Sequence, residues 1–336
     1  MKKRIIIGVT AAVIIILILA WLADPMKLIQ SLGQVSPKFI LIVIVLYLIN
    51  MLTKAFRWYL LVNATGAKAP FSKTFPFYVI ALAFNNLTPG KIGGEPVRAY
   101  LLKKELNVSV GQSIASIFAE KIMDIIVITT MAVIGAIFII PLLPVTTGRI
   151  LIVVLVIALS AIISVILIVS HPKFLNKTVD KSIKFAMRIS KRDFFKRLSM
   201  AFTGFLDRFR FGMTEILRAK SSASACILLT VIIWINEAVR LFIILLALPT
   251  IEGISLGAVF IASSIANILG FAVPIGAGNI LGAETVFVAL GMAWSDAAAA
   301  SFLHVATSIW LSVPIGIIAM ILTGVRLSKI ANSNKV

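Results

Sequence analysis

Residues 85–98 read N-N-L-T-P-G-K-I-G-G-E-P-V-R, so two prolines and three glycines lie among amide and charged side chains. The preceding apolar run, residues 74–84, is shorter than the ~20 residues that a helix needs to cross a bilayer. Pro and Gly break helices and leave backbone polar groups unpaired, which hydrocarbon tolerates only beside protein or a watery cavity. The stretch therefore predicts a broken helix that lines a polar cavity in a membrane protein. The alternative is an ordinary cytoplasmic loop after a short membrane helix.

The composition is that of a membrane protein. Of 336 residues, 60% are hydrophobic and 13% are charged. The 32 Lys and Arg residues outnumber the 13 Asp and Glu residues. In so apolar a chain we assign this excess to cytoplasmic loops and anionic lipid headgroups, and we expect no nucleic-acid partner. The single cysteine, Cys226, excludes an intramolecular disulfide and a cysteine-clustered metal site.

The apolar runs predict an all-α integral membrane protein with about six spanning helices and two re-entrant or broken helix pairs. Basic residues near both ends place both termini in the cytoplasm, with the chain in the cell membrane. The expected spans are residues 5–23, 39–62, 109–140, 150–170, 221–248 and 297–323, and the broken pairs are residues 74–106 and 255–294. The expected domains are an N-terminal anchor and outer loop (1–34), a first membrane repeat (35–170), a basic linker (171–220) and a second, inverted repeat (221–336).

The linker, residues 171–220, is the one polar insert. It holds 13 basic and 4 acidic residues with phenylalanines interleaved among them. This pattern favours amphipathic helices that lie on the anionic cytoplasmic leaflet. A solvated linker is the alternative.

Charged residues also occur inside the predicted spans. Glu120 and Asp124 lie one helical turn apart, and Lys54 and Arg57 can share a helix face. Intramembrane charges are costly and usually face the bundle interior or a transport pathway. Two plainer alternatives are that the two cations snorkel to the inner interface, and that Lys121 neutralises Asp124 in a purely structural pair.

The two halves of the chain echo each other. Asn50 and Lys54 correspond to Asn236 and Arg240 at an offset of 186, and Pro89 corresponds to Pro274 at an offset of 185. The predicted topology makes these units inverted, with one broken segment entered from the inside and the other from the outside. Inverted repeats with broken helices in matching positions are typical of transporters, with the site at the repeat interface.

Three motifs carry a resemblance to a known family: N-N-L-T-P-G-K-I-G-G-E-P-V-R-A-Y (85–100), A-E-K-I-M-D (119–124) and P-I-G-A-G-N-I-L-G-A-E (274–284). Over roughly residues 35–325 the chain resembles the flippase-like transmembrane domain of lysylphosphatidylglycerol synthases. The resemblance implies movement of lipids or lipid-linked sugars between leaflets. The soluble synthase domain of the bifunctional members has no counterpart within residues 171–220, so we expect no synthase activity.

We therefore predict a lipid flippase that moves an anionic phospholipid or a polyprenyl-phosphate-linked substrate by alternating access. Half-helix amino ends and unpaired N–H groups near Gly90, Gly93 and Gly94 would hold phosphate oxygens, and basic side chains would add charge. We expect no catalytic residues, cofactor or metal, and anionic membrane lipids as partners, with a second copy of the chain or a lipid-synthesis enzyme as further candidates. The predicted substrate-binding residues are Lys54, Arg57, Asn85, Asn86, Thr88, Gly90, Gly93, Gly94, Glu95, Arg98, Glu120, Lys121, Asp124, Asn236, Glu237, Arg240, Gly276, Gly278, Asn279 and Glu284.

Two other function classes remain open from the sequence. A non-transporting membrane subunit could scaffold a lipid or glycan synthesis complex. An intramembrane lipid-modifying enzyme would need a nucleophile with a base, or a metal site, but the chain has only His171 and His304 and lacks H-E-x-x-H, P-loop and G-x-S-x-G motifs.

Overall fold

The computed structural model describes residues 14–22, 24–142, 193–248 and 255–325, with isolated residues between 145 and 160. Within these ranges the chain is helical and contains no β-strand. Residues 171–192 of the linker and both chain ends lie outside the described residues. So do most of the predicted span at 150–170 and the first part of the predicted anchor.

Four described helices are long and apolar enough to cross a membrane, and they match four of the six predicted spans. They are α3 (Pro37–Ala64), α6 (Val110–Ile139), α10 (Lys220–Leu246) and the continuous run of α13 (Trp294–Val305), the π-helical turn η3 (Ala306–Trp310) and α14 (Leu311–Thr323). Local sequence sets their ends: Pro37 occupies the first turn of α3, where its missing N–H costs nothing, and the Ser109 hydroxyl accepts the Gln112 N–H at the start of α6.

The outer loop predicted to follow the N-terminal anchor contains a helix, α2 (Pro25–Gly33). Pro25 pre-sets the first helical turn, and the short amphipathic segment buries Leu28. The Ser31 hydroxyl donates to the Asp296 carboxylate of α13 over 2.9 Å, so α2 is held against the end of that helix. The segment expected to be a short outer loop therefore holds a helix, whose amphipathic pattern was not recognised in the sequence.

The chain folds into a helical hairpin on either side of the first predicted break. α4 (Phe71–Leu87) ends at Thr88, the turn η1 (Pro89–Lys91) follows with φ of 77° at Gly90, and α5 (Gly94–Leu106) returns. A Cβ atom added to Gly94 would lie 2.0 Å from the Ala81 carbonyl oxygen, so the two helices touch through their backbones. Only glycine permits that approach.

The second predicted break forms a matching hairpin. α11 (Leu256–Ala272) ends before Pro274, Gly276 has φ of 86°, and α12 (Ala277–Ala289) returns. A Cβ atom on Gly278 would lie 2.1 Å from the Leu269 carbonyl oxygen, which repeats the backbone contact of the first hairpin. The predicted interruptions near Pro89 and Pro274 are thus confirmed.

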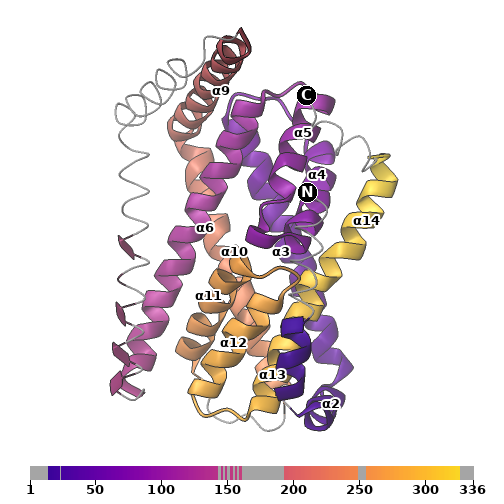
Figure 1. Cartoon of the computed structure of the whole chain (residues 1–336), viewed down its shortest axis with the longest axis vertical. Helices are drawn as coiled ribbons and strands as arrows, with labels where there is room; N and C mark the ends of the chain where they lie inside the picture. The colour runs from indigo at the N-terminus through magenta and orange to yellow at the C-terminus, as the bar shows by residue number, and fades with distance from the viewer. Residues whose placement is uncertain are drawn as a thin grey trace.

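The two hairpins point toward each other and meet at their tips. Figure 1 shows α4 and α5 in the upper half of the molecule and α11 and α12 in the lower half, while α6 runs along most of its length. The Ile275 N–H donates to the Asn86 carbonyl oxygen over 2.9 Å, and the Lys91 ammonium donates to the Asn279 side-chain oxygen over 3.2 Å. The irregular backbone of each turn therefore meets protein rather than lipid.

Each hairpin packs against a long helix from the other half of the chain. α4 lies against α14, α11 lies against α6, and α3 lies against α10. Small residues allow these close contacts: a Cβ on Gly316 of α14 would come within 2.3 Å of the Ala83 side chain, and one on Gly135 of α6 within 2.7 Å of the Gly257 carbonyl oxygen. Small-residue contacts of this kind are common between helices in membranes.

Two apolar core clusters surround the hairpins. One, which includes Trp58, Phe77 and Leu101, joins α3, α4 and α5; the other, which includes Leu241 and Phe287, joins α10 to α13. In the linker, α9 (Asp193–Arg218) is amphipathic, as predicted for that part of the chain, and packs against α6.

Candidate functional site

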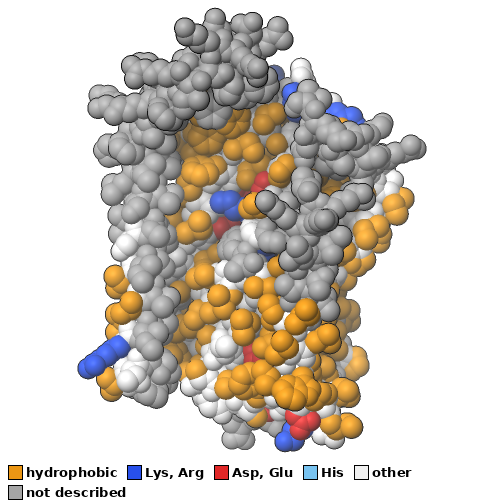
Figure 2. Space-filling model, in the orientation of Figure 1, with side chains coloured by type: hydrophobic (Ala, Val, Ile, Leu, Met, Phe, Trp, Pro, Cys, Tyr) orange, Lys and Arg blue, Asp and Glu red, His pale blue; other side chains and the backbone are white. Residues whose placement is uncertain are grey.

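A polar cavity of about 120 Å³ lies where the hairpin tips meet the long helices. It has room for several water molecules or a small anionic group, but not for a whole lipid. Figure 2 shows a small group of basic and acidic side-chain atoms at mid-height, surrounded by hydrophobic side chains. The cavity is lined by Tyr47, Met51, Lys54, Arg57, Tyr78, Leu82, Asn85, Asn86, Lys91, Glu120, Lys121, Asp124, Trp234, Glu237, Asn267, Asn279, His304, Ser308 and Ile309.

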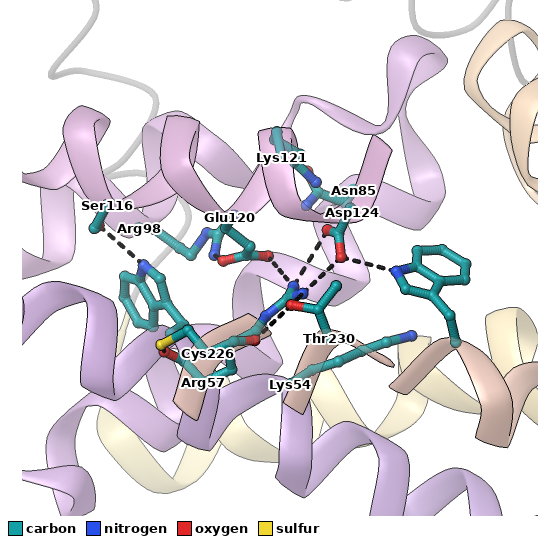
Figure 3. A network of polar contacts seen from close by, with 12 residues as sticks. Lys54, Arg57, Asn85, Arg98, Ser116, Glu120, Lys121, Asp124, Cys226 and Thr230 are labelled. Atoms are coloured by element: carbon teal, nitrogen blue, oxygen red, sulfur yellow. Dashed lines mark hydrogen bonds and ion pairs between the residues drawn. The ribbon is translucent and has the colours of Figure 1, made fainter. Parts of the chain in front are cut away.

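Arg57 of α3 lies at the centre of a group of charged side chains from the first half of the chain (Figure 3). Its guanidinium donates to both Asp124 carboxylate oxygens, over 2.6 and 3.2 Å, and to the Thr230 hydroxyl over 2.9 Å. The Glu120 carboxylate lies 3.4 Å away. Arg57 is fully buried, so its charge is paired inside the protein rather than exposed at the surface. The snorkelling alternative is therefore wrong for this residue.

Arg98 of α5 is buried in the same network, with an exposed fraction of 1%. It donates to Glu120 over 2.7 Å and to Glu95 from Nε over 2.9 Å and from Nη2. Its guanidinium also lies 5.0 Å from the centre of the Trp58 ring and 5.3 Å from that of Tyr78, within cation–π range. Glu120 therefore joins the two arginines through one carboxylate.

Lys121 completes this group, and it pairs with Glu95 at 3.3 Å rather than with Asp124. The alternative in which Lys121 neutralises Asp124 is wrong, because Arg57 occupies both oxygens of that carboxylate. The Trp234 indole N–H also donates to Asp124 over 2.9 Å. Spacing along one helix thus identified the acidic residues of the site correctly, but it assigned the wrong cationic partner to Asp124.

A second charged group is built around Glu237 of α10. Its two carboxylate oxygens accept from Lys54 over 2.7 Å and from Arg240 over 2.8 Å. His304 Nε2 lies 3.6 Å from the same carboxylate. The Arg240 guanidinium stacks 5.0 Å from the centre of the Tyr47 ring and is fully buried. One carboxylate therefore serves two cations here.

The backbone N–H groups at the first break are not unpaired as expected. The Gly94 N–H donates to the Asn85 side-chain oxygen over 2.7 Å, and the Gly93 N–H donates to the Thr88 hydroxyl over 3.0 Å. The predicted use of these two N–H groups for phosphate is therefore wrong in this conformation. Asn85 and Thr88 instead act as caps for the start of α5, because side-chain oxygens satisfy the free donors of a helix end.

The structure brings most of the predicted site residues together, and it separates two of them. Nine line the cavity: Lys54, Arg57, Asn85, Asn86, Glu120, Lys121, Asp124, Glu237 and Asn279. Glu95, Arg98 and Arg240 bind those residues through ion pairs, while Thr88, Gly90, Gly93, Gly94, Gly276 and Gly278 shape the turns and backbone contacts of the hairpins. Asn236 and Glu284 do not line the cavity.

Several lining residues were not predicted from the sequence. Lys91 lies within residues 85–98 but was not among the predicted binding residues, and His304 was considered only as a histidine of the last span. Asn267 is a polar residue within an apolar helix, which is itself a signal for an interior position in a membrane protein. Tyr47 and Trp234 gave no such signal, because aromatic residues are ordinary in apolar helices.

Glu284 gives a first testable prediction. It is fully buried on α12, and neither carboxylate oxygen accepts a hydrogen bond from the described residues. An ionised carboxylate is very costly in such a place, so the neutral isostere should fit as well. We expect Glu284→Gln to keep the wild-type unfolding temperature in detergent. The matched change Glu120→Gln should lower it, because Glu120 bridges two arginines; equal losses in both variants would contradict the prediction.

Comparison with known proteins places this arrangement in a family. Residues 5–316 match the family described as the lysylphosphatidylglycerol synthase TM region. A UPF0104 membrane protein of Methanothermobacter thermautotrophicus is 27% identical over 332 residues, which cover 94% of this chain and 93% of the relative. UPF0104 membrane proteins of Methanocaldococcus jannaschii (26%, covering 95% of both chains) and Pyrococcus horikoshii (28%, covering 74% of this chain and 75% of the relative) are also similar.

The family match covers all four of the long apolar helices up to the middle of α14, together with both hairpins and every residue that lines the cavity. The resemblance inferred from the three motifs is thus confirmed over a longer stretch of the chain. The protein is a multi-pass membrane protein that belongs to the lysylphosphatidylglycerol synthase transmembrane-region family.

Proposed function

We propose that this protein moves a lipid with an anionic headgroup, either a phospholipid or a polyprenyl-phosphate-linked lipid, from one leaflet to the other. The observation that carries the proposal is the meeting of two oppositely directed broken hairpins at a buried, charge-lined cavity. Broken helices that meet near the centre of a helix bundle are the usual way in which transporters build a substrate site.

The packing pattern supports an inverted repeat. If α3 to α6 correspond to α10 to α14, exchanging the two units turns the α4–α14 contact into the α11–α6 contact and leaves the α3–α10 contact unchanged. A two-fold axis in the membrane plane would produce this pattern. Such symmetry allows one unit to rock against the other, so that the cavity opens to each side in turn.

The size of the cavity fits a headgroup rather than a whole lipid. At about 120 Å³ it accommodates a phosphate with its waters, while the acyl chains would remain in the bilayer. The charged lining offers what a phosphate needs when it leaves water, namely cationic hydrogen-bond donors in a buried place.

The test is a flip assay with the purified protein in vesicles that contain a trace of fluorescent lipid. We expect phosphatidylglycerol labelled on its acyl chain to become accessible to a membrane-impermeant reductant in both leaflets, and labelled phosphatidylcholine to stay largely protected in the inner one. A labelled polyprenyl phosphate tests the second substrate class. Folded, monodisperse protein that moves neither anionic lipid would reject the proposal, and activity that appears only with a co-purifying enzyme would favour the scaffold alternative.

A further inference from the structure

The charged residues around the cavity form two groups that differ in formal net charge. The first, which we call the balanced cluster, holds three cations and three carboxylates that pair with one another: Arg57, Arg98, Lys121, Glu95, Glu120 and Asp124. Its formal charge is therefore zero. Both arginines are at least 99% buried and occupied by carboxylates, so an incoming phosphate would have to displace an acid to reach either one.

The second group, which we call the cation-rich cluster, consists of Lys54, Lys91, Arg240 and Glu237. Lys54 and Arg240 share the single Glu237 carboxylate, and the Lys91 ammonium donates to the neutral Asn279 side chain. Lys54, Lys91 and Glu237 all line the same cavity. Three cations and one acid give these four residues a formal charge of +2.

Hydrogen-bonding capacity is left over at the same place. Nε and Nη2 of Arg240 and the Tyr47 hydroxyl are buried and have no hydrogen-bond partner among the described residues, and His304 Nε2 has only its 3.6 Å contact with the Glu237 carboxylate. Tyr47 and His304 line the cavity, and Arg240 lies directly behind the Tyr47 ring. Buried donors normally have partners, so an unoccupied set beside a net positive charge indicates a place for an anion.

From this asymmetry, and on the basis of the proposed function, we propose that the phosphate of the transported lipid binds the cation-rich cluster, with Lys54 and Lys91 as its direct partners. Glu237 holds Lys54 and Arg240 in place and limits the net charge, so that an anion can bind and also leave. The balanced cluster then serves as the internal support of the first hairpin rather than as the phosphate site.

Binding of a phosphate group can be measured without transport. We would titrate the delipidated protein in detergent with short-chain phosphatidylglycerol, short-chain phosphatidylcholine and inorganic phosphate, and follow both the unfolding temperature and the lipid-bound fraction by native mass spectrometry. Phosphatidylglycerol should bind and stabilise the wild-type protein far more than phosphatidylcholine does. Stabilisation by inorganic phosphate but not by phosphatidylglycerol would overturn the assignment to a lipid headgroup.

Lysine-to-glutamine variants locate the site. Lys54→Gln and Lys91→Gln should each weaken phosphatidylglycerol binding by about tenfold, the loss expected for one charge-assisted hydrogen bond, and the double variant should not bind measurably. Lys121→Gln removes a cation of the balanced cluster from the same cavity and should have a smaller effect. Lys27→Gln, at an exposed pair with Asp24, should leave binding unchanged. A loss in Lys121→Gln as large as that in Lys54→Gln would overturn the proposal.

A variant that strengthens binding guards against misfolding as an explanation. Glu237→Gln raises the formal charge of the cluster from +2 to +3, so phosphatidylglycerol should bind several-fold more tightly and stabilise this variant more than it does the wild type. Weaker binding in a Glu237→Gln variant whose unfolding temperature without lipid matches that of the wild type would count against the charge argument. If the wild type binds the anionic lipid at this cluster and still does not flip it, the site stands and the proposed transport fails. If both lysine changes leave flipping unaffected, transport stands and the cation-rich cluster is not its phosphate site.

Discussion

Replacing Arg98 with methionine should destabilise the folded protein by about 3–5 kcal/mol, the cost of removing one partner from a buried ion pair. Methionine keeps much of the side-chain length, so the loss comes chiefly from charge. Glu95 and Glu120 would remain buried with fewer donors, and the stacking on Trp58 and Tyr78 would lose its cationic part. The measurement is the apparent unfolding temperature of the purified variant in detergent.

The chain provides a matched control for this substitution. Arg218 pairs with Glu215 three residues away, as Arg98 pairs with Glu95, but the Arg218 side chain is 75% exposed. Exposed pairs contribute about 0–1 kcal/mol, so Arg218→Met should barely change the unfolding temperature. Arg98→Met and Arg218→Met variants of equal stability would show that the buried network contributes little to the fold.

Replacing Gly94 or Gly278 with alanine should push apart the two helices of the hairpin that contains it. The added Cβ would lie 2.0 Å from the Ala81 carbonyl oxygen in the first case and 2.1 Å from that of Leu269 in the second. Backbone atoms cannot rotate away as a side chain can, so the two helices must move apart. Overpacking usually lowers the free energy of unfolding by roughly 1–3 kcal/mol, and we expect each of these variants to lose at least the upper end of that range.

Gly33→Ala is the control for both glycine variants, because nothing lies within 4 Å of the position that its Cβ would take. Its unfolding temperature and yield should equal those of the wild type. If Gly94→Ala also behaved like the wild type, the close backbone contact between α4 and α5 would not exist in the folded protein. Measuring Gly278→Ala in parallel tests whether the two hairpins depend on this contact to the same degree.

The sequence predicted the membrane fold and both breaks because each rests on a local, strong signal. Long apolar runs gave the four described spans to within a few residues, and Pro89 and Pro274 interrupt runs that are too short to cross a bilayer. Helix α2 was missed because its amphipathic pattern is short and was interpreted as a loop. Local patterns therefore predict most elements, and they fail where one pattern fits two structures.

Partners within the site were harder to predict than its members. Glu120 and Asp124 were expected to share a helix face, and both do contact Arg57. Which cation each acid would meet depends on how α3, α5 and α6 pack, and spacing along one helix carries no information about that. For the same reason the caps formed by Asn85 and Thr88 were not expected: they depend on the chain turning back by a few residues so that side-chain oxygens meet the Gly93 and Gly94 N–H groups.

The exchange of packing partners between the two halves has a consequence for biosynthesis. The hairpin of α4 and α5 leaves the ribosome long before α14, yet α14 supplies the surface against which α4 packs. Until that last helix is made, the face of α4 that carries Ala83 lacks Gly316, the residue against which it packs in the folded protein. The first hairpin therefore reaches its final packing only when translation is nearly complete, and insertion factors or lipid must cover it in the meantime.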